Sequence, residues 1–196
     1  PVGGSSFELS AKFTLPYSLF NNVDYANLKD QTEYQNDDGT PNQAKIDQEK
    51  FRWLEFYKIK FKSSWYTKII DKFVLKTHAE FGFLGAYNQD RGIIPFDRFF
   101  LGGDGMSQYA MDGRETVSLR GYQNQSLSDQ DGSTIYNKFS IELRYPITLK
   151  PSASIFALTF LESGNGFNSF REFNPFNGKR SAGLGVRIFM PAFGLL

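Results

Sequence analysis

Apolar and polar side chains alternate along the first part of the chain. In residues 6–16 every second position is apolar, and these positions are Phe7, Leu9, Ala11, Phe13 and Leu15. The positions between them, from Glu8 to Thr14, are polar or charged. A period of two places the two kinds of side chain on opposite faces of an extended strand. The segment therefore predicts a β-strand, which Pro16 ends.

The same alternation predicts five further strands. We expect them at residues 51–66, 73–88, 136–147, 153–163 and 180–190. In the second of the six, Leu54, Glu55 and Phe56 interrupt the pattern. No segment shows the 3.6-residue period that would indicate a helix. The predicted fold class is all-β.

The connections between these strands alternate in length. Short turns are expected at residues 67–72 and 146–152, and long polar loops at residues 17–50, 89–136 and 164–179. Up-and-down barrels of the bacterial outer membrane have short turns on one side and long loops on the other. A soluble β-sandwich shows the same alternation of faces without such a rule for its loops. The connections therefore favour an antiparallel up-and-down transmembrane β-barrel.

Two tryptophans add a length argument. Trp53 and Trp65 lie on the apolar face of the second predicted strand, twelve residues apart. At about 3.3 Å per residue and a tilt near 45°, they would be roughly 28 Å apart along a membrane normal, close to the hydrocarbon thickness. We therefore expect them in the two aromatic girdles of a membrane barrel. In a sandwich they would be ordinary core aromatics.

The opposite face of that strand carries Lys58, Lys60 and Lys62. These cations repel one another and need water, which would fill the interior of a barrel or be bulk solvent around a soluble protein. Six strands cannot close alone around so wide and charged an interior, because barrels of about eight strands fill theirs with side chains. We therefore expect a partial barrel of about six strands.

Composition excludes several classes of function. The net charge is +1, from 22 basic and 21 acidic residues, and gives no reason to expect nucleic acid as a partner. Cysteine is absent and His78 is the only histidine, which rules out thiolate and multi-histidine metal sites. Mean hydropathy is −0.40, and no run of about 18 apolar residues indicates a membrane helix.

Individual motifs give no catalytic site. DQDGS at residues 129–133 lacks the later glutamate of a calcium loop, and FLGGDG at residues 100–105 lacks the strand–helix context of a phosphate loop. Glu142 and Glu162 could form an acid–base pair, but cations lie nearby and no substrate cleft is recognisable. We expect no enzyme, no cofactor and no metal.

Three motifs follow one another in the second half of the chain. They are PFDRFFLGG at Pro95–Gly103, LRGY at Leu119–Tyr122 and NKFSIELRYP at Asn137–Pro146. In this order they resemble the BamA family of outer-membrane protein assembly factors, where the tetrad lies in the sixth external loop. FLESGNGF at residues 160–167 and KRSAGLGVRIFMP at residues 179–191 are similar to the two strands that follow in the family.

The resemblance covers almost the whole chain. It implies that residues 1–196 are the carboxy-terminal part of an outer-membrane β-barrel domain, corresponding to strands nine to fourteen of sixteen. Residues 104–118 are inserted relative to the family pattern, which resembles BamA proteins of the Bacteroidetes type. The family pattern continues through two more strands after the one that residues 179–191 resemble.

The resemblance also implies a function in the outer membrane of a Gram-negative bacterium. Family members insert and assemble other β-barrel proteins, without enzymatic chemistry. The implied partners are outer-membrane lipids, unfolded outer-membrane client proteins and accessory assembly subunits. The alternatives are a passive porin or receptor barrel, a two-partner-secretion translocase and a soluble β-sandwich binding module.

A site follows from the same resemblance. In the family the sixth loop folds into the barrel, and its arginine meets carboxylates of the inner wall, which here would be Arg120, Glu142 and Glu162. The alternation of side chains independently places Glu142 on the polar face of its strand. A planar guanidinium can bind two carboxylates in a fixed geometry. We expect this anchor to involve the whole tetrad, Leu119, Arg120, Gly121 and Tyr122.

Overall fold

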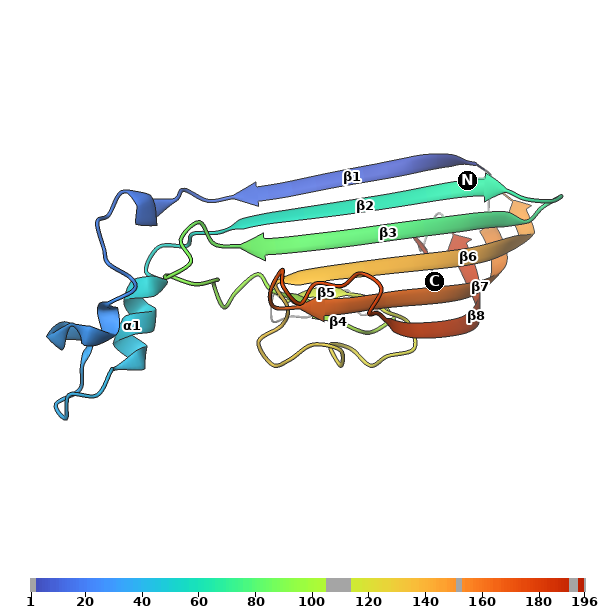
Figure 1. Ribbon diagram of the computed structural model, residues 1–196. Coiled ribbons are helices and arrows are strands. Elements are labelled where there is room, and N and C mark those ends of the chain that lie inside the picture. Colours follow the sequence, from blue (N-terminus) through green and yellow to red (C-terminus); the bar gives the residue numbers. More distant parts are fainter. Residues whose placement is uncertain (1–2, 105–113, 151–152, 191–193, 196) are drawn as a thin grey trace. The chain divides into compact units, whose positions relative to one another are not determined.

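The computed structural model describes residues 3–104, 114–150, 153–190 and 194–195 (Figure 1). Most of the insertion at residues 104–118 lies outside the described residues, as do residues 151–152. The turn expected at residues 146–152 was placed too early, because residues 146–150 still belong to a strand. None of the helices in the described ranges has the length and apolar character needed to traverse a lipid bilayer.

One antiparallel sheet contains all the long strands. In spatial order they are β1 (Gly4–Phe13), β2 (Tyr57–Lys68), β3 (Val74–Gly85), β6 (Ile135–Lys150), β7 (Ala153–Phe167) and β8 (Lys179–Met190), followed by the two-residue β9 (Gly194–Leu195). The six long strands run up and down, and the sheet is not closed. The predicted all-β, partial-barrel fold is therefore confirmed.

In this sheet the apolar face is exposed and the charged face is buried, which is the reverse of a soluble protein. Apolar side chains of alternate positions are exposed, including Phe7, Leu9, Phe13, Trp65, Ile141, Leu161, Leu184 and Val186. Charged side chains of the other face are buried, including Lys58, Lys138, Glu142 and Glu162. Such a sheet would be unfavourable in water, because charges are desolvated while large apolar groups are not. It suits a position between lipid and a polar interior.

The second strand begins later than the alternation predicts. Residues 51–56 lie outside β2, and the residues before them form the helix α1 (Gln43–Lys50). The predictions of a strand over residues 51–66 and of no helix were therefore wrong. Asn42 caps the helix, since its side chain accepts a hydrogen bond from Lys45 N at 3.1 Å. Ile46 is the only buried residue of α1, so the sequence carries no apolar stripe to indicate the helix.

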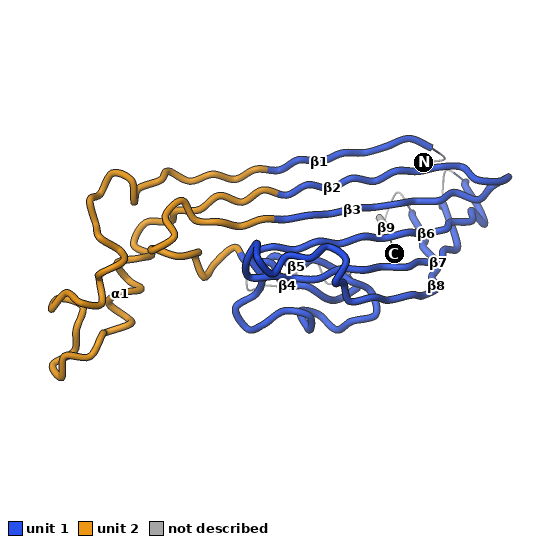
Figure 2. Tube along the Cα trace, in the orientation of Figure 1, with its two compact units in different colours: residues 1–10, 60–82, 98–196 blue, residues 11–59, 83–97 orange. Residues whose placement is uncertain are grey.

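The chain divides into two compact units (Figure 2). The first comprises Pro1–Ser10, Lys60–Gly82 and Arg98–Leu196, and the second comprises Ala11–Ile59 and Phe83–Asp97. Each unit therefore contains parts of strands together with the loops that continue from them.

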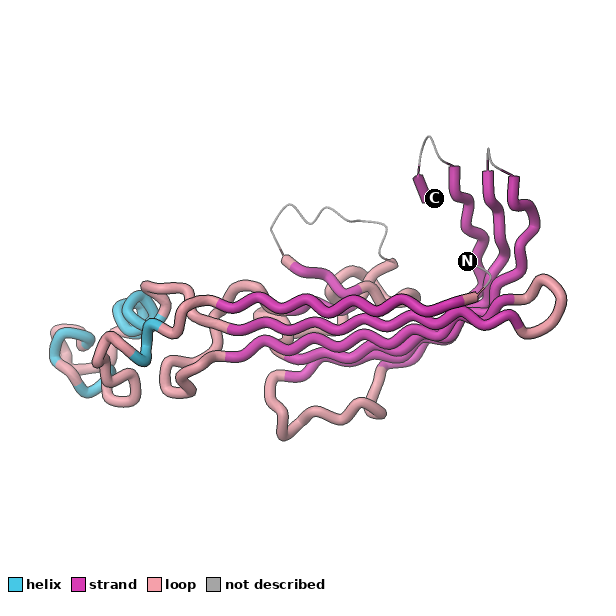
Figure 3. Tube along the Cα trace, turned by 90° about the horizontal axis from the view of Figure 1, so that it is seen from above, coloured by secondary structure: helices cyan, strands magenta, loops and turns pink. Residues whose placement is uncertain are grey.

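The second unit contains structure where a polar loop was expected. In the part of the chain that the structure describes, helical turns occur only within residues 17–50 (Figure 3). They are η1 (Tyr17–Leu19), η2 (Leu28–Asp30), η3 (Thr32–Tyr34) and α1. Tyr25, Leu28 and Ile46 form a small buried core, against which Val23 and Tyr34 pack. The long connection between β1 and β2 is thus a folded module.

The first unit contains two short strands before β6. β4 (Phe99–Leu101) and β5 (Glu115–Val117) pair in parallel. All three residues of β4 are buried, as is Val117. Phe99 also forms an isolated bridge with Ser133. This packing fixes the segment that leads directly into the LRGY tetrad.

A loop arginine against two wall carboxylates as the candidate functional site

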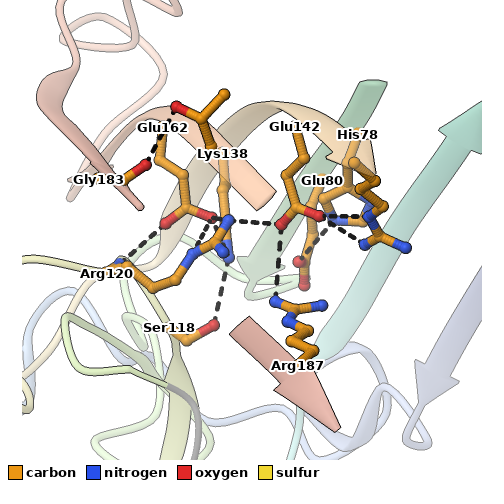
Figure 4. Close-up of polar contacts among 11 residues, drawn as sticks. His78, Glu80, Ser118, Arg120, Lys138, Glu142, Glu162, Gly183 and Arg187 are labelled. Atoms are coloured by element: carbon orange, nitrogen blue, oxygen red, sulfur yellow. Dashed lines mark hydrogen bonds and ion pairs between the residues drawn. The ribbon is translucent and has the colours of Figure 1, made fainter. Parts of the chain in front are cut away.

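Glycines let the chain turn tightly around the tetrad. Gly102 and Gly103 follow β4 with φ of 121° and 97°, values that residues with side chains rarely adopt. Gly103 bridges to Leu119 and donates its N–H to the carbonyl of Tyr122 at 3.0 Å. Leu119 is buried. The turn closes on itself in this way and leaves Arg120 pointing at β6 and β7 (Figure 4).

Arg120 binds both carboxylates that the resemblance implied. Its Nε and Nη2 donate to Glu162 Oε1 at 3.0 and 2.7 Å, and Nη2 also donates to Glu142 Oε1 at 2.6 Å. Its backbone N–H donates to Glu162 Oε2 at 2.8 Å. Burial of Arg120 opposes its positive charge, but the bonds to Glu162 and Glu142 outweigh burial and raise the pKa of the guanidinium. The loop is thus attached by side chain and main chain together.

The strand pairing brings the two carboxylates to one place. In the register of β6 and β7, Glu142 lies opposite Phe160 and Glu162 lies opposite Ser140. The two glutamates therefore occupy diagonal positions on one face, within reach of one guanidinium. Both side chains are about 2 % exposed. Charges buried so deeply require several partners to offset desolvation.

Other cations complete the cluster. Arg144 donates to Glu142 Oε2 from Nε at 2.9 Å and from Nη2 at 2.5 Å. Arg187 Nη2 lies 3.6 Å from Glu142 Oε1, and Lys138 Nζ lies 3.8 Å from Glu162 Oε1. Lys138 and Arg144 lie an even number of positions from Glu142 on β6 and so share its face, but nothing in the sequence indicated that they share carboxylates with Arg120. The carboxylates would keep counter-charges without the loop.

Phe160 supports the guanidinium from the wall. The Arg120 Cζ atom lies 3.8 Å from the centre of the Phe160 ring, a cation–π contact. Gly183 of β8 lies opposite Phe160 across the strands, and a Cβ at that position would overlap the ring. Glycine therefore provides the space that this phenylalanine occupies. Phe160 and Glu162 are two positions apart on β7 and so share a face, but the sequence did not indicate this contact.

The last two residues of the tetrad contact β8. Gly121 has φ of 88°, and a Cβ there would lie 3.1 Å from Ser181 Cβ, closer than most side chains allow. Tyr122 Oη donates to the carbonyl of Arg180 at 2.8 Å. The tetrad therefore reaches three strands of the wall, β6, β7 and β8.

His78 belongs to a separate polar cluster on β2, β3 and β6. Its Nδ1 lies 2.8 Å from Ser64 Oγ, and its Nε2 lies 3.5 Å from Glu80 Oε2. Tyr136 Oη donates to Glu80 Oε1 at 2.6 Å, and Lys62 lies 3.7 Å from the same oxygen. The histidine thus links wall side chains. The described residues contain no group of histidine, aspartate and glutamate suited to holding a metal ion.

The two tryptophans expected in membrane girdles have different settings. Trp65 lies in β2, is half-exposed and meets the ring of Phe7 edge-on at 5.3 Å. Trp53 is equally exposed but precedes β2, where its ring lies 5.3 Å from Tyr17. The separation of roughly 28 Å assumed one continuous strand and therefore does not apply. The girdle role of both indoles stays a prediction.

A second buried arginine–glutamate pair lies in the second unit. Glu55 is fully buried and accepts hydrogen bonds from Ser18 N at 2.7 Å and Ser18 Oγ at 2.5 Å. Arg91 Nη1 lies 3.3 Å from Glu55 Oε2, and other nitrogens of Arg91 donate to the carbonyls of Lys50 and Trp53. This pair connects the loop before β2 with the loop after β3. In the sequence, Glu55 was visible only as an interruption of the strand pattern.

Asp97 links two strands within the same unit. Its carboxylate lies 3.0 Å from Lys12 Nζ and 3.2 Å from Lys58 Nζ. Partial burial by itself would raise the pKa of Asp97, but the two ammonium groups outweigh it and hold the pKa below its ordinary value. The loop after β3 is therefore tied to β1 and β2.

The sequence matches a known family over most of its length. Residues 48–196 match the Omp85 superfamily domain. Among curated proteins, no sequence gives a significant match to the chain. The matched range contains β2, all later strands, the tetrad and both wall carboxylates.

Proposed function

Because the chain belongs to the Omp85 superfamily, we propose that it is part of a BamA-type insertase. The superfamily includes insertases and translocases of the Gram-negative outer membrane, and its members assemble or transport proteins without enzymatic chemistry. The insertase would fold client β-barrel proteins into the outer membrane, together with accessory subunits and in contact with outer-membrane lipids. The exposed apolar face and buried charged face support a membrane position.

The observation that carries the proposal is the attachment of Arg120 to Glu142 and Glu162. A loop held by one guanidinium on two strands has a defined position relative to both, and Phe160 prevents the guanidinium from tilting away. The loop would thus remain inside the barrel and keep its interior surface in one arrangement while a client strand is added. The resemblance of the tetrad and its neighbouring motifs to the BamA family favours an insertase among the superfamily's functions.

The test separates loop position from barrel formation. Arg120→Ala removes the side-chain bonds to both carboxylates, so the loop leaves the wall while the barrel still forms. Arg120→Lys restores the positive charge but cannot make the coplanar hydrogen bonds to two carboxylates, so it should restore loop position and client assembly only in part. Cysteines at Ser118 and Ser140, which line one cavity, report loop position by crosslinking, and residues 1–196 contain no other cysteine. Client assembly is measured as the fraction of a client barrel that becomes protease-resistant.

Arg171→Ala is the matched control, since this exposed arginine lies in the loop between β7 and β8. It should change neither crosslinking nor assembly. If Arg120→Ala leaves both unchanged, the anchor has no role and the proposal is wrong. If it abolishes export of a passenger protein while client assembly continues, the protein is a translocase of the same superfamily.

A further inference from the structure

A second cavity opens on the polar side of the sheet, away from the tetrad. It has a volume of about 730 Å³ and is lined by residues of the first unit only. The lining comes from β2, the turn after it, β3, β6, β7 and β8. No residue of the tetrad lines this groove, although Arg144 and Arg187 of the neighbouring cluster do. Only Lys76 and Arg187 also border the smaller cavity around Arg120.

The groove is strongly cationic. Its basic residues are Lys68, Lys72, Lys76, Arg144 and Arg187, against one carboxylate, Asp71. Arg144 is held by Glu142, but within the described residues neither Lys68 nor Lys72 forms a salt bridge. Arg187 lies 3.6 Å from Glu142, beyond hydrogen-bond distance, and keeps N–H groups for another acceptor. Such a surface attracts anions.

Aromatic side chains lie beside these cations. The guanidinium of Arg144 lies 5.6 Å from the ring of Tyr66 and 5.3 Å from that of Phe156. Phe189 also lines the groove, two residues from Arg187 on β8, and 44 % of it is exposed. The groove therefore offers apolar contacts as well as cations.

We propose that this groove binds an extended polypeptide segment in which carboxylates alternate with aromatic or aliphatic side chains. Such a segment offers carboxylates and apolar side chains in turn, and the groove offers partners for both: lysines and arginines for the carboxylates, and Phe189 and Phe156 for the apolar side chains. Guanidinium groups bind carboxylates with two parallel hydrogen bonds, which suits Arg187.

The size of the groove favours a peptide over a lipid headgroup. Lys68 on β2 and Arg187 on β8 are four strand spacings apart, about 19 Å at roughly 4.8 Å per spacing. One phosphate cannot meet cations at both ends, whereas about six extended residues span about 20 Å. In an insertase the source would be a strand of an unfolded client. That identification rests on the proposed function, but the binding chemistry does not.

The test uses the full-length protein in detergent and a fluorescent eight-residue peptide of alternating glutamate and phenylalanine. The double variant Lys68→Glu, Lys72→Glu should weaken binding about tenfold, since two attractive contacts become repulsive. The double variant Lys29→Glu, Lys45→Glu has the same charge change at exposed lysines outside the groove and should bind as the original protein does. Phe189→Ala should weaken this peptide severalfold while leaving a glutamate–alanine peptide unaffected.

Three results would overturn the inference. The groove variants could bind as well as the control, a peptide with lysine in place of glutamate could bind equally well, or dodecyl phosphate could displace the peptide completely at equal concentration. The last would identify a phosphate lipid site instead. If peptide binding follows the prediction but the groove variants assemble clients normally, the site stands and only its assignment to clients fails. If Arg120→Ala leaves client assembly unchanged and the insertase proposal fails, the peptide assay still tests the groove, because binding is measured directly.

Discussion

Two buried arginine–glutamate clusters, one in each unit, solve the same problem in different ways. Arg91 is 2 % exposed and meets a single carboxylate, Glu55, which has no other cation among its contacts with the described residues. Arg120 is 15 % exposed and meets two carboxylates, Glu142 and Glu162, which have other cations nearby. The first cluster is therefore a closed pair and the second is a shared network. In a closed pair, loss of one member leaves the other as an isolated buried charge. In a network, the remaining members still have partners when one is lost.

The largest effect is expected from breaking the closed pair. Arg91→Met keeps most of the side-chain volume but leaves Glu55 charged and buried without a counter-charge, and the carbonyls of Lys50 and Trp53 lose their donor. Removing one partner of a buried pair costs about 3–5 kcal/mol. Amide hydrogen exchange of α1 and residues 51–56 should accelerate accordingly. The double variant with Glu55→Leu should recover part of the loss, because the isolated charge is gone.

A smaller effect on stability is expected from Arg120→Ala. Arg144 and Arg187 remain beside Glu142, and Lys138 remains beside Glu162. We expect the strands around the two glutamates to lose about 1 kcal/mol or less, although the loop is released. Hydrogen exchange of β6 and β7 amides measures this loss. If Arg120→Ala and Arg91→Met destabilise their surroundings equally, the distinction between pair and network does not hold.

The smallest effect is expected from acid acting on Asp97. Its pKa is lowered in the folded protein, so the stabilisation it gives is complete above the unfolded value, about 3.9, and is lost as pH falls through the folded value. Lys12 and Lys58 would then lose their shared partner. Exchange of β1 amides near Lys12, corrected for intrinsic pH dependence, should rise below about pH 4. Asp97→Asn should show the faster exchange already at pH 7, with no further change in that range.

The first unit was largely predictable from its sequence. The two faces of its strands differ, one being apolar and exposed and the other charged and buried. Apolar and polar residues therefore alternate throughout β6 and β8. The Arg120 cluster was foreseeable because the tetrad and both glutamates occur in motifs with a fixed order. The cation–π contact with Phe160 depends on strand register and on the absence of a side chain at Gly183, neither of which the pattern specifies.

The second unit was harder to predict for a physical reason. The buried cluster within the β1–β2 connection comprises three residues, Tyr25, Leu28 and Ile46, in a segment rich in asparagine and aspartate. The module also depends on a buried polar contact, between Glu55 and Arg91, 36 positions later in the chain. A buried charge pair leaves no periodic signal, and a single glutamate in an apolar run looks like an error in a strand. Long-range polar contacts of this kind become visible only in three dimensions.

The register of β6 and β7 has a consequence for the order in which the molecule forms. The hairpin closes locally, with Lys150 paired to Ala153, whereas Arg120 must find partners 22 and 42 residues away. Loop-closure entropy and contact order both favour the short-range event. We therefore expect the hairpin to form first and to present Glu142 and Glu162 together as a ready-made acceptor. Docking of the tetrad would then be a late step, which requires that the β6–β7 hairpin has already formed.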